Sequence, residues 1–170
     1  MKSLKVARRR VREIIVKAEG MILCETPSPY ADRVTVDTPE KVATYWRENI
    51  GGHPLFPDGV ESLHVILLST RRHVLGHCLV AQGLLDQILV HAREVFRPAI
   101  MANAHSVVVV HNHPSGDPSP SEADIRVTRD LMRAGQLLKI EVLDHVVMGR
   151  PSAHRPKDYA SLRGLGYCYT

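Results

Sequence analysis

The stretch of sequence that decides the fold spans residues 107–124 and reads VVVVHNHPSGDPSPSEAD. Its apolar beginning predicts a buried β-strand over residues 106–111. Three prolines and a glycine then predict an irregular loop. Ser121 and Asp124, spaced three residues apart, are typical of the N-terminal cap of a helix, which we expect over residues 122–134. The segment therefore predicts a strand, a loop and a helix in succession.

The same stretch carries three side chains of the types that bind a catalytic zinc ion. His111 and His113 lie two residues apart at the end of the strand, so both can point to one side of it. The loop can bring Asp124 back beside them. Two imidazoles and a carboxylate leave a fourth zinc position for water, which predicts a catalytic metal centre. A purely structural cap remains an alternative for Asp124 and Ser121, and the two interpretations are compatible.

The remaining elements follow from apolar periodicity, caps and turns. We expect a basic amphipathic helix over residues 4–17, a linker over 24–32, a helix that begins at Thr38-Pro39 and stops near Gly51, a β-hairpin of strands 62–69 and 74–81, a helix over 91–103 that Pro98 bends or delays, a helix end at Gly135, and a strand over 139–148. Strands mixed with helices indicate an α+β or α/β fold, in which helices flank a mixed β-sheet.

Composition excludes several classes of protein. A chain of 170 residues that is 44% hydrophobic is long and apolar enough for one domain with a sizeable core. The sequence contains no run of 18 apolar residues, so we expect no membrane span, and no apolar segment follows the basic start as it would in a signal peptide. The three cysteines, Cys24, Cys78 and Cys168, are far apart and predict a reduced, cytoplasmic protein.

Positive charge is concentrated at the beginning of the chain. Residues 1–20 have a net charge of +5, whereas the rest of the chain has −1. We therefore divide the chain into a basic arm and linker, residues 1–37, and one domain, residues 38–170. The arm can bind DNA or another polyanion through Arg8, Arg9, Arg10 and Arg12. A solvated basic helix is the alternative, since residues 1–29 contain no aromatic side chain that could stack on a base.

The motif His111-x-His113-Pro, with Ser121-x-x-Asp124, resembles the JAMM motif of MPN/JAB-domain metalloproteins. The longer string His-Asn-His-Pro-Ser-Gly-Asp-Pro, with Asp144-His145 further on, resembles the RadC-like branch of that superfamily in a short, stand-alone form. This resemblance covers the chain from about Thr38 onward. It implies the cytidine-deaminase-like sandwich of MPN/JAB domains and one Zn2+ per chain. The implied activity is that of a zinc metalloprotease, which hydrolyses a peptide or isopeptide bond.

The resemblance also suggests which side chains carry out catalysis. A JAMM glutamate lies just before a strand, as Glu61 does, and would be the general base. Ser121 would donate a hydrogen bond to the developing oxyanion. From its own surroundings in the sequence, without the resemblance, Glu61 would be interpreted as an exposed loop acid at the start of a strand. The role of Asp144 and His145 stays open between support of a ligand histidine and strand packing.

A second function remains open. RadC-like proteins are named for DNA repair, so the chain could be a DNA-associated accessory module whose metal site is structural or vestigial. The basic arm favours this hypothesis, and the complete set of JAMM positions favours the hydrolase. We expect a peptide or protein substrate for the hydrolase and no membrane partner in either case.

Overall fold

The computed structural model describes residues 14–17, 20–23, 34–53, 56–57, 59–83 and 90–168. Its three helices are α1 (Pro39–Asn49), α2 (Ala92–Met101) and α3 (Glu122–Leu138). Its strands are β1 (Ile14–Lys17), β2 (Gly20–Leu23), β3 (Glu61–Leu68), β4 (Val74–Gly83), β5 (Ser106–Asn112), β6 (Glu141–Met148) and β7 (Tyr159–Ser161). Within the described residues, no helix is long and apolar enough to cross a membrane.

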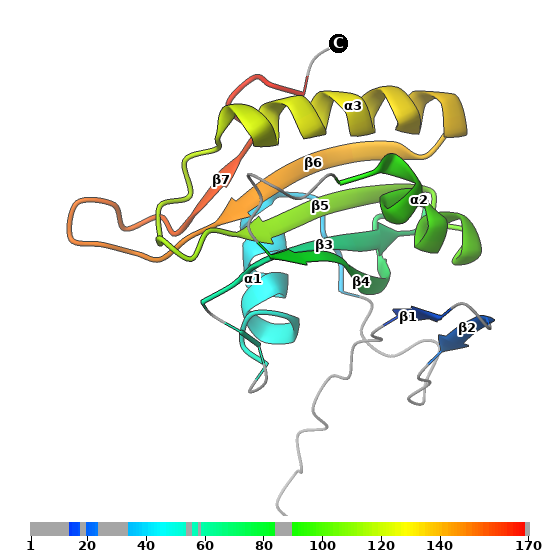
Figure 1. The fold of residues 1–170 in the computed structure, drawn as a ribbon, viewed down its shortest axis with the longest axis horizontal. Helices are drawn as coiled ribbons and strands as arrows, with labels where there is room; N and C mark the ends of the chain where they lie inside the picture. The colour runs from blue at the N-terminus through cyan, green and yellow to red at the C-terminus, as the bar shows by residue number, and fades with distance from the viewer. Residues whose placement is uncertain are drawn as a thin grey trace, which may run out of the picture.

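Five strands form one mixed sheet in the order β4-β3-β5-β6-β7 (Figure 1). The predicted hairpin of β3 and β4 is present, and β3 also pairs antiparallel with β5. β5 and β6 run parallel, with α3 as the connection between them. All seven residues of β5 are buried, as its valine run predicts for a central strand covered on both faces. The expected mixed sheet with flanking helices is confirmed.

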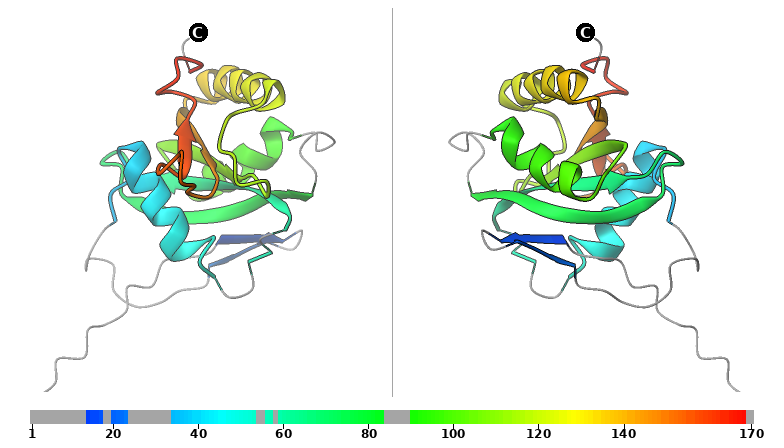
Figure 2. Two further views of the ribbon diagram at one scale, coloured as in Figure 1. Left: turned by 90° about the vertical axis from the view of Figure 1, so that its left-hand side faces the viewer. Right: turned by 90° about the vertical axis from the view of Figure 1, so that its right-hand side faces the viewer.

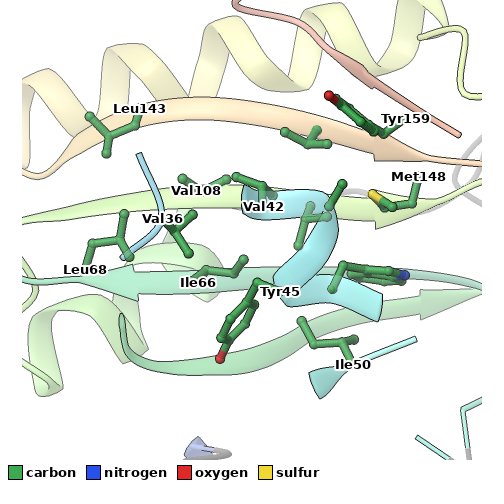
Figure 3. Close-up of a cluster of buried hydrophobic side chains, with 14 residues drawn as sticks. Val36, Val42, Tyr45, Ile50, Ile66, Leu68, Val108, Leu143, Met148 and Tyr159 are labelled. Atoms are coloured by element: carbon green, nitrogen blue, oxygen red, sulfur yellow. The ribbon is translucent and has the colours of Figure 1, made fainter. Parts of the chain in front are cut away.

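The helices form layers on both faces of the sheet. α2 and α3 lie on one face and α1 on the other (Figure 2). Val42 and Tyr45 of α1 pack against Ile66, Val108 and their neighbours in an apolar cluster (Figure 3). The sheet therefore has a hydrophobic core on each side, and its strands can be apolar along both faces.

Two helices begin where capping residues predict. The Thr38 hydroxyl accepts a hydrogen bond from the Lys41 N–H, and Pro39 occupies the first position of α1, where its missing N–H has no intrahelical partner to lose. Ser121 and Asp124 form a reciprocal capping box at the start of α3. This box fixes the orientation of the Asp124 side chain at the start of α3.

The predicted helix over residues 4–17 is wrong in its last turn. Ile14–Lys17 form the strand β1, which pairs antiparallel with Gly20–Leu23 and lies beside β4. The sequence Ile-Ile-Val has high β-propensity because branched side chains fit a pleated strand, and this preference prevails over the helical spacing of apolar residues. The rest of that helix and the linker over residues 24–32 lie outside the described residues.

α3 continues past Gly135, where we expected it to end, and stops at Leu138. Lys139 adopts the left-handed cap conformation (φ 58°) that Gly135 was expected to supply. Gly135 instead allows a close approach, because a Cβ at this position would lie 2.5 Å from the Ile140 carbonyl oxygen and 3.2 Å from Phe96 Cζ. The glycine therefore serves packing between α3, α2 and the chain leading into β6.

Candidate metal centre

Four side chains from three elements meet at one edge of the sheet. The two histidine Nε2 atoms of His111 and His113 are 3.0 Å apart. Glu61, the first residue of β3, places Oε1 3.6 Å from His111 Nε2 and 3.5 Å from His113 Nε2. Asp124, in the first turn of α3, contacts the same two nitrogens. Its Oδ1 lies 3.3 Å from His111 Nε2, and its Oδ2 lies 3.6 Å from His113 Nε2. The topology explains the meeting, because β3 begins where the antiparallel β5 ends.

Glu61, His111 and His113 form a compact group that could hold a metal ion, since their ligand atoms lie within 4.8 Å of one another. The three residues that the sequence predicts as ligands, His111, His113 and Asp124, also converge. The site therefore offers two imidazoles and two carboxylates, of which one comes from β3 and the other from α3. Such a set suits zinc or another divalent transition metal.

The orientation of His113 is fixed by the loop that follows β5. Its Nδ1 lies 2.7 Å from the backbone carbonyl of Asp117, which can only accept, so Nδ1 carries the proton. Neutral His113 then directs an Nε2 lone pair towards His111. Two imidazole nitrogens at 3.0 Å must have either a hydrogen-bonding proton or a metal ion between them. This arrangement fits a divalent cation.

Asp124 is buried and oriented by Ser121. One carboxylate oxygen, Oδ2, accepts hydrogen bonds from the Ser121 N–H (2.7 Å) and the Ser121 hydroxyl (2.7 Å). The Ser121 oxygen in turn accepts from the Asp124 N–H at 3.1 Å. Oδ1 is the Asp124 oxygen that faces His111. Capping and metal binding are therefore compatible functions of one carboxylate, and Ser121 lies at the site.

Glu61 is held at the site by a link between β5 and the start of β3. The Asn112 amide donates to the Val60 carbonyl (3.0 Å) and accepts from the Ser62 N–H (2.9 Å), so it grips the backbone on both sides of Glu61. Glu61 is 11% exposed, whereas Asp124 is 3% exposed. The glutamate is thus the carboxylate on the more open side. The sequence gives no sign of this role of Asn112, because its partners lie some fifty residues away in the chain.

The electrostatics of the site separate the two histidines. Complete burial, with the neighbouring His145, holds the pKa of His111 well below its ordinary value. Burial also acts against protonation of His113, but the Asp124 carboxylate, the Asp117 carbonyl and the charge of Glu61 outweigh it and raise the pKa of His113. Burial opposes ionisation of Asp124, yet His113, His111 and Ser121 hold the pKa of this carboxyl low. In the folded protein, at most one of the His111 and His113 rings is therefore positively charged, and the Asp124 carboxylate beside them is ionised.

A cavity of about 250 Å³ opens beside His113. Apolar groups of Trp46, Phe56 and Met148 line it, and an ion pair of Arg47 and Asp158 lies at its edge. Trp46 and Phe56 make an edge-to-face contact with centroids 5.4 Å apart. The metal centre thus adjoins a space with both apolar and charged walls.

Comparison with known proteins identifies the family. A model of the RadC-like JAB domain matches residues 36–167. The chain belongs to the RadC-like JAB domain family. The UPF0758 protein CT0611 of Chlorobaculum tepidum is 48% identical over 102 residues, which are 60% of this chain and 46% of the relative. A UPF0758 protein of Desulfitobacterium hafniense is 53% identical over 89 residues, 52% of this chain and 39% of the relative. The chain spans less than half the length of these curated relatives.

Two further side chains of this RadC-like JAB domain, from β6 and α3, lie beside the candidate metal centre. His145 Nε2 lies 2.8 Å from His111 Nδ1, and Thr128 Oγ1 lies 2.6 Å from His145 Nδ1. The sequence leaves Asp144-His145 open between support of a ligand histidine and strand packing, and the contact of His145 with His111 agrees with the first alternative. Nothing in the sequence points to Thr128. Only the parallel pairing of β5 and β6, with Val109 opposite His145, brings these side chains together.

Proposed function

We propose that this protein is a zinc-dependent hydrolase of the JAMM type, which cleaves a peptide or isopeptide bond. The observation that supports this most strongly is the 3.0 Å approach of two imidazole nitrogens between the carboxylates of Glu61 and Asp124. A zinc ion held there would lower the pKa of a water molecule from about 15.7 towards 7 and so supply hydroxide at neutral pH. The family match agrees with such chemistry.

In this proposal His111, His113 and Asp124 hold the metal, and Glu61 is the general base. Asp124 suits the ligand role because Ser121 holds its Oδ2 while Oδ1 faces His111. Glu61 suits the base because it reaches both histidines from the more exposed side, where water and substrate enter. Glu61 would take a proton from water and pass it to the leaving nitrogen of the amide.

Ser121 would stabilise the oxyanion that develops on the substrate carbonyl. Its single hydroxyl proton is directed to Asp124 Oδ2, so it must turn towards the substrate during the reaction. The Ser121 N–H can continue to hold Oδ2 while the hydroxyl turns. A side-chain donor in this role contributes about 3 kcal/mol to transition-state stabilisation.

Metal content tests the ligand assignment. We expect one zinc per chain in the purified protein and loss of that zinc in His113→Ala, measured by elemental analysis. Lys41→Ala, on the exposed surface of α1, is the control and should retain zinc. Full zinc occupancy in His113→Ala would remove this residue from the ligand set.

The base assignment needs a variant that keeps the metal. Glu61→Gln should retain zinc and lose amide hydrolysis by at least about 100-fold, as removal of a general base does. If Glu61→Gln instead loses the metal, then Glu61 is a ligand, as its place in the compact group with His111 and His113 also permits. Undiminished turnover would assign the base to another residue.

The competing function is association with DNA, and the +5 charge of residues 1–20 favours it. We propose residues 1–37 as a separable arm and 38–170 as the domain. Salt-sensitive DNA binding that is lost on deletion of residues 1–20, together with zinc binding but no amide hydrolysis, would establish the accessory function. We also propose a cytoplasmic location, since the three cysteines are far apart in the sequence and form no Cys-x-x-Cys pair.

A further inference from the structure

The pair Asp144-His145 takes no direct part in the proposed chemistry, yet His145 reaches the metal centre from β6. His145 is 1% exposed, and its two ring nitrogens contact His111 Nδ1 at 2.8 Å and Thr128 Oγ1 at 2.6 Å. Thr128, which is also buried, belongs to α3 and follows Asp124 by one helical turn. Thr128 of α3 therefore contacts His145 of β6, which contacts His111 of β5, and all three side chains are buried.

The direction of these hydrogen bonds follows from what each group can donate. Thr128 Oγ1 lies 2.6 Å from the backbone carbonyl of Asp124, which can only accept, so the single hydroxyl proton points to that carbonyl. Thr128 Oγ1 must then accept from His145 Nδ1–H. A neutral imidazole carries one ring proton, so His145 Nε2 accepts from His111 Nδ1–H. His111 is left with a lone pair on Nε2.

We propose that Thr128 and His145 are positioning residues that hold His111 in the Nδ1–H tautomer, with Nε2 ready to bind a divalent metal ion. His113 obtains the same tautomer directly from the Asp117 carbonyl. His111 Nδ1 instead meets a ring nitrogen of His145, which accepts only in one tautomer, so the hydroxyl of Thr128 is needed to set the direction of the hydrogen bond. The inference rests on the proposed function for the identity of the ion, whereas the order of the hydrogen bonds stands apart from it.

Asp144 has a different part, because its carboxylate secures the backbone around His145. It accepts hydrogen bonds from the His145 N–H (2.7 Å), the Arg163 N–H (3.1 Å) and the Ser161 hydroxyl (2.6 Å). These bonds fasten β6 to β7 and the C-terminal segment without touching the ring nitrogens. Ser161→Ala is therefore a matched control, since it weakens the same strand and leaves the tautomers unchanged.

The first test measures the tautomer in the full-length wild-type protein after zinc is removed with a chelator. Long-range ¹H–¹⁵N correlation spectra at pH 7.5 distinguish protonated from unprotonated ring nitrogens. We expect His111 and His145 both to carry their proton on Nδ1. A His111 proton on Nε2 would overturn the proposal, whatever metal the protein binds.

The second test compares zinc affinity, by competition with a chromophoric chelator, in three variants. Thr128→Val removes the hydroxyl at constant shape, which frees both rings to change tautomer, and should weaken binding by about 10- to 100-fold. Thr128→Ser keeps the hydroxyl and should stay within about twofold, as should Ser161→Ala. Equal affinities of Thr128→Val and wild type would overturn the proposal.

The two tests also separate this inference from the proposed function. If the wild-type protein binds zinc but hydrolyses no amide, the hydrolase proposal fails and the affinity comparison still tests Thr128. If the variants bind as expected and the spectra show Nδ1–H on His111, the positioning role holds even for a structural metal site.

Discussion

At the scale of single residues, histidine burial is the most consequential feature outside the metal centre. His64 and His77 lie together on the α1 side of the sheet, with ring centroids 6.1 Å apart. His64 packs edge-to-face on Trp46, and no hydrogen-bond partner of its Nδ1 is found in the described part of the chain. Burial lowers the pKa of His64 to about 3 and that of His77 to about 4. Both rings are therefore neutral in the folded protein.

Stability should fall in mild acid for this reason. The unfolded chain binds protons at these histidines below pH 6.5, and the folded protein does so only near pH 3–4, so the free energy of unfolding decreases as the pH falls through 6.5. We expect His64→Phe, which keeps an aromatic ring and cannot titrate, to lose less stability than wild type between pH 7.5 and pH 5. Urea denaturation at both pH values measures the difference.

The comparison between the variant and wild type cancels the opposite contribution of His113. Its raised pKa adds stability at low pH that is lost as the pH rises through the folded value. If the free energy of unfolding changed with pH equally in His64→Phe and in wild type, His64 would be protonated to the same extent in the folded and the unfolded protein.

At the scale of elements, the end of α3 shows how one glycine and one lysine exchange their expected roles. The Gly135 carbonyl accepts from the N–H groups of Lys139 and Ile140, so the chain turns back against the glycine itself. Lys139 has the positive φ that favours glycine, and Gly135 has the close contact that only glycine permits.

Two substitutions in this turn should therefore change stability in opposite directions. Gly135→Ala should lower the free energy of unfolding by about 1–3 kcal/mol through overpacking, despite the gain in helix propensity. Lys139→Gly should raise it by up to about 1 kcal/mol because the left-handed backbone is strained for lysine. Leu137→Ala, at an 84% exposed position, is the control and should change stability by less than about 0.5 kcal/mol. A stabilised Gly135→Ala would refute the close approach.

Much of this element pattern could be predicted from the sequence because local chemistry determines it. The valine run of β5, the caps of α1 and α3 and the β3–β4 hairpin depend on residues within a few positions of one another. The end of α3 could not, because the contact of Gly135 with Phe96 joins separate helices. The short β7 depends likewise on pairing with β6 and carries too few residues for a pattern.

At the scale of the whole molecule, the candidate site lies where distant segments converge. His111, His113 and Asp124 were predictable, since strand alternation and a helix cap bring them together over fourteen residues. Glu61 required the family resemblance, because fifty residues separate it from His111 and only the antiparallel register with β5 joins them. Thr128 and His145 required the parallel register of β5 and β6.

Arg155 connects two of these segments. Its guanidinium donates to the Gly116 carbonyl (2.6 Å), the Asp117 carboxylate (3.0 Å) and the Arg150 carbonyl (3.3 Å). It thus joins the segment between β6 and β7 to the loop whose Asp117 carbonyl orients His113. The geometry of His113, a proposed metal ligand, therefore depends on a side chain more than forty residues away in sequence.

Loss of this connection should loosen the loop. We expect Arg155→Ala to increase amide hydrogen exchange over residues 115–119 and to weaken zinc binding several-fold. Arg155→Lys should not rescue it, because an ammonium group lacks the planar fork of donors. Arg133→Ala removes an exposed ion pair with Asp130 and should leave exchange in the loop unchanged. Wild-type exchange in Arg155→Ala would show that the prolines hold the loop without help.

One residue in the wall of the cavity beside His113 provides a way to measure binding. Trp46 is the single tryptophan of the chain, it is 5% exposed, and it faces this cavity. Indole emission therefore comes from one known place, in the wall of the same cavity as His113, with no second tryptophan to add to the signal. Binding of a peptide in this cavity should change the fluorescence of Trp46. Candidate peptides can therefore be screened by titration with the untagged chain before any assay of turnover exists.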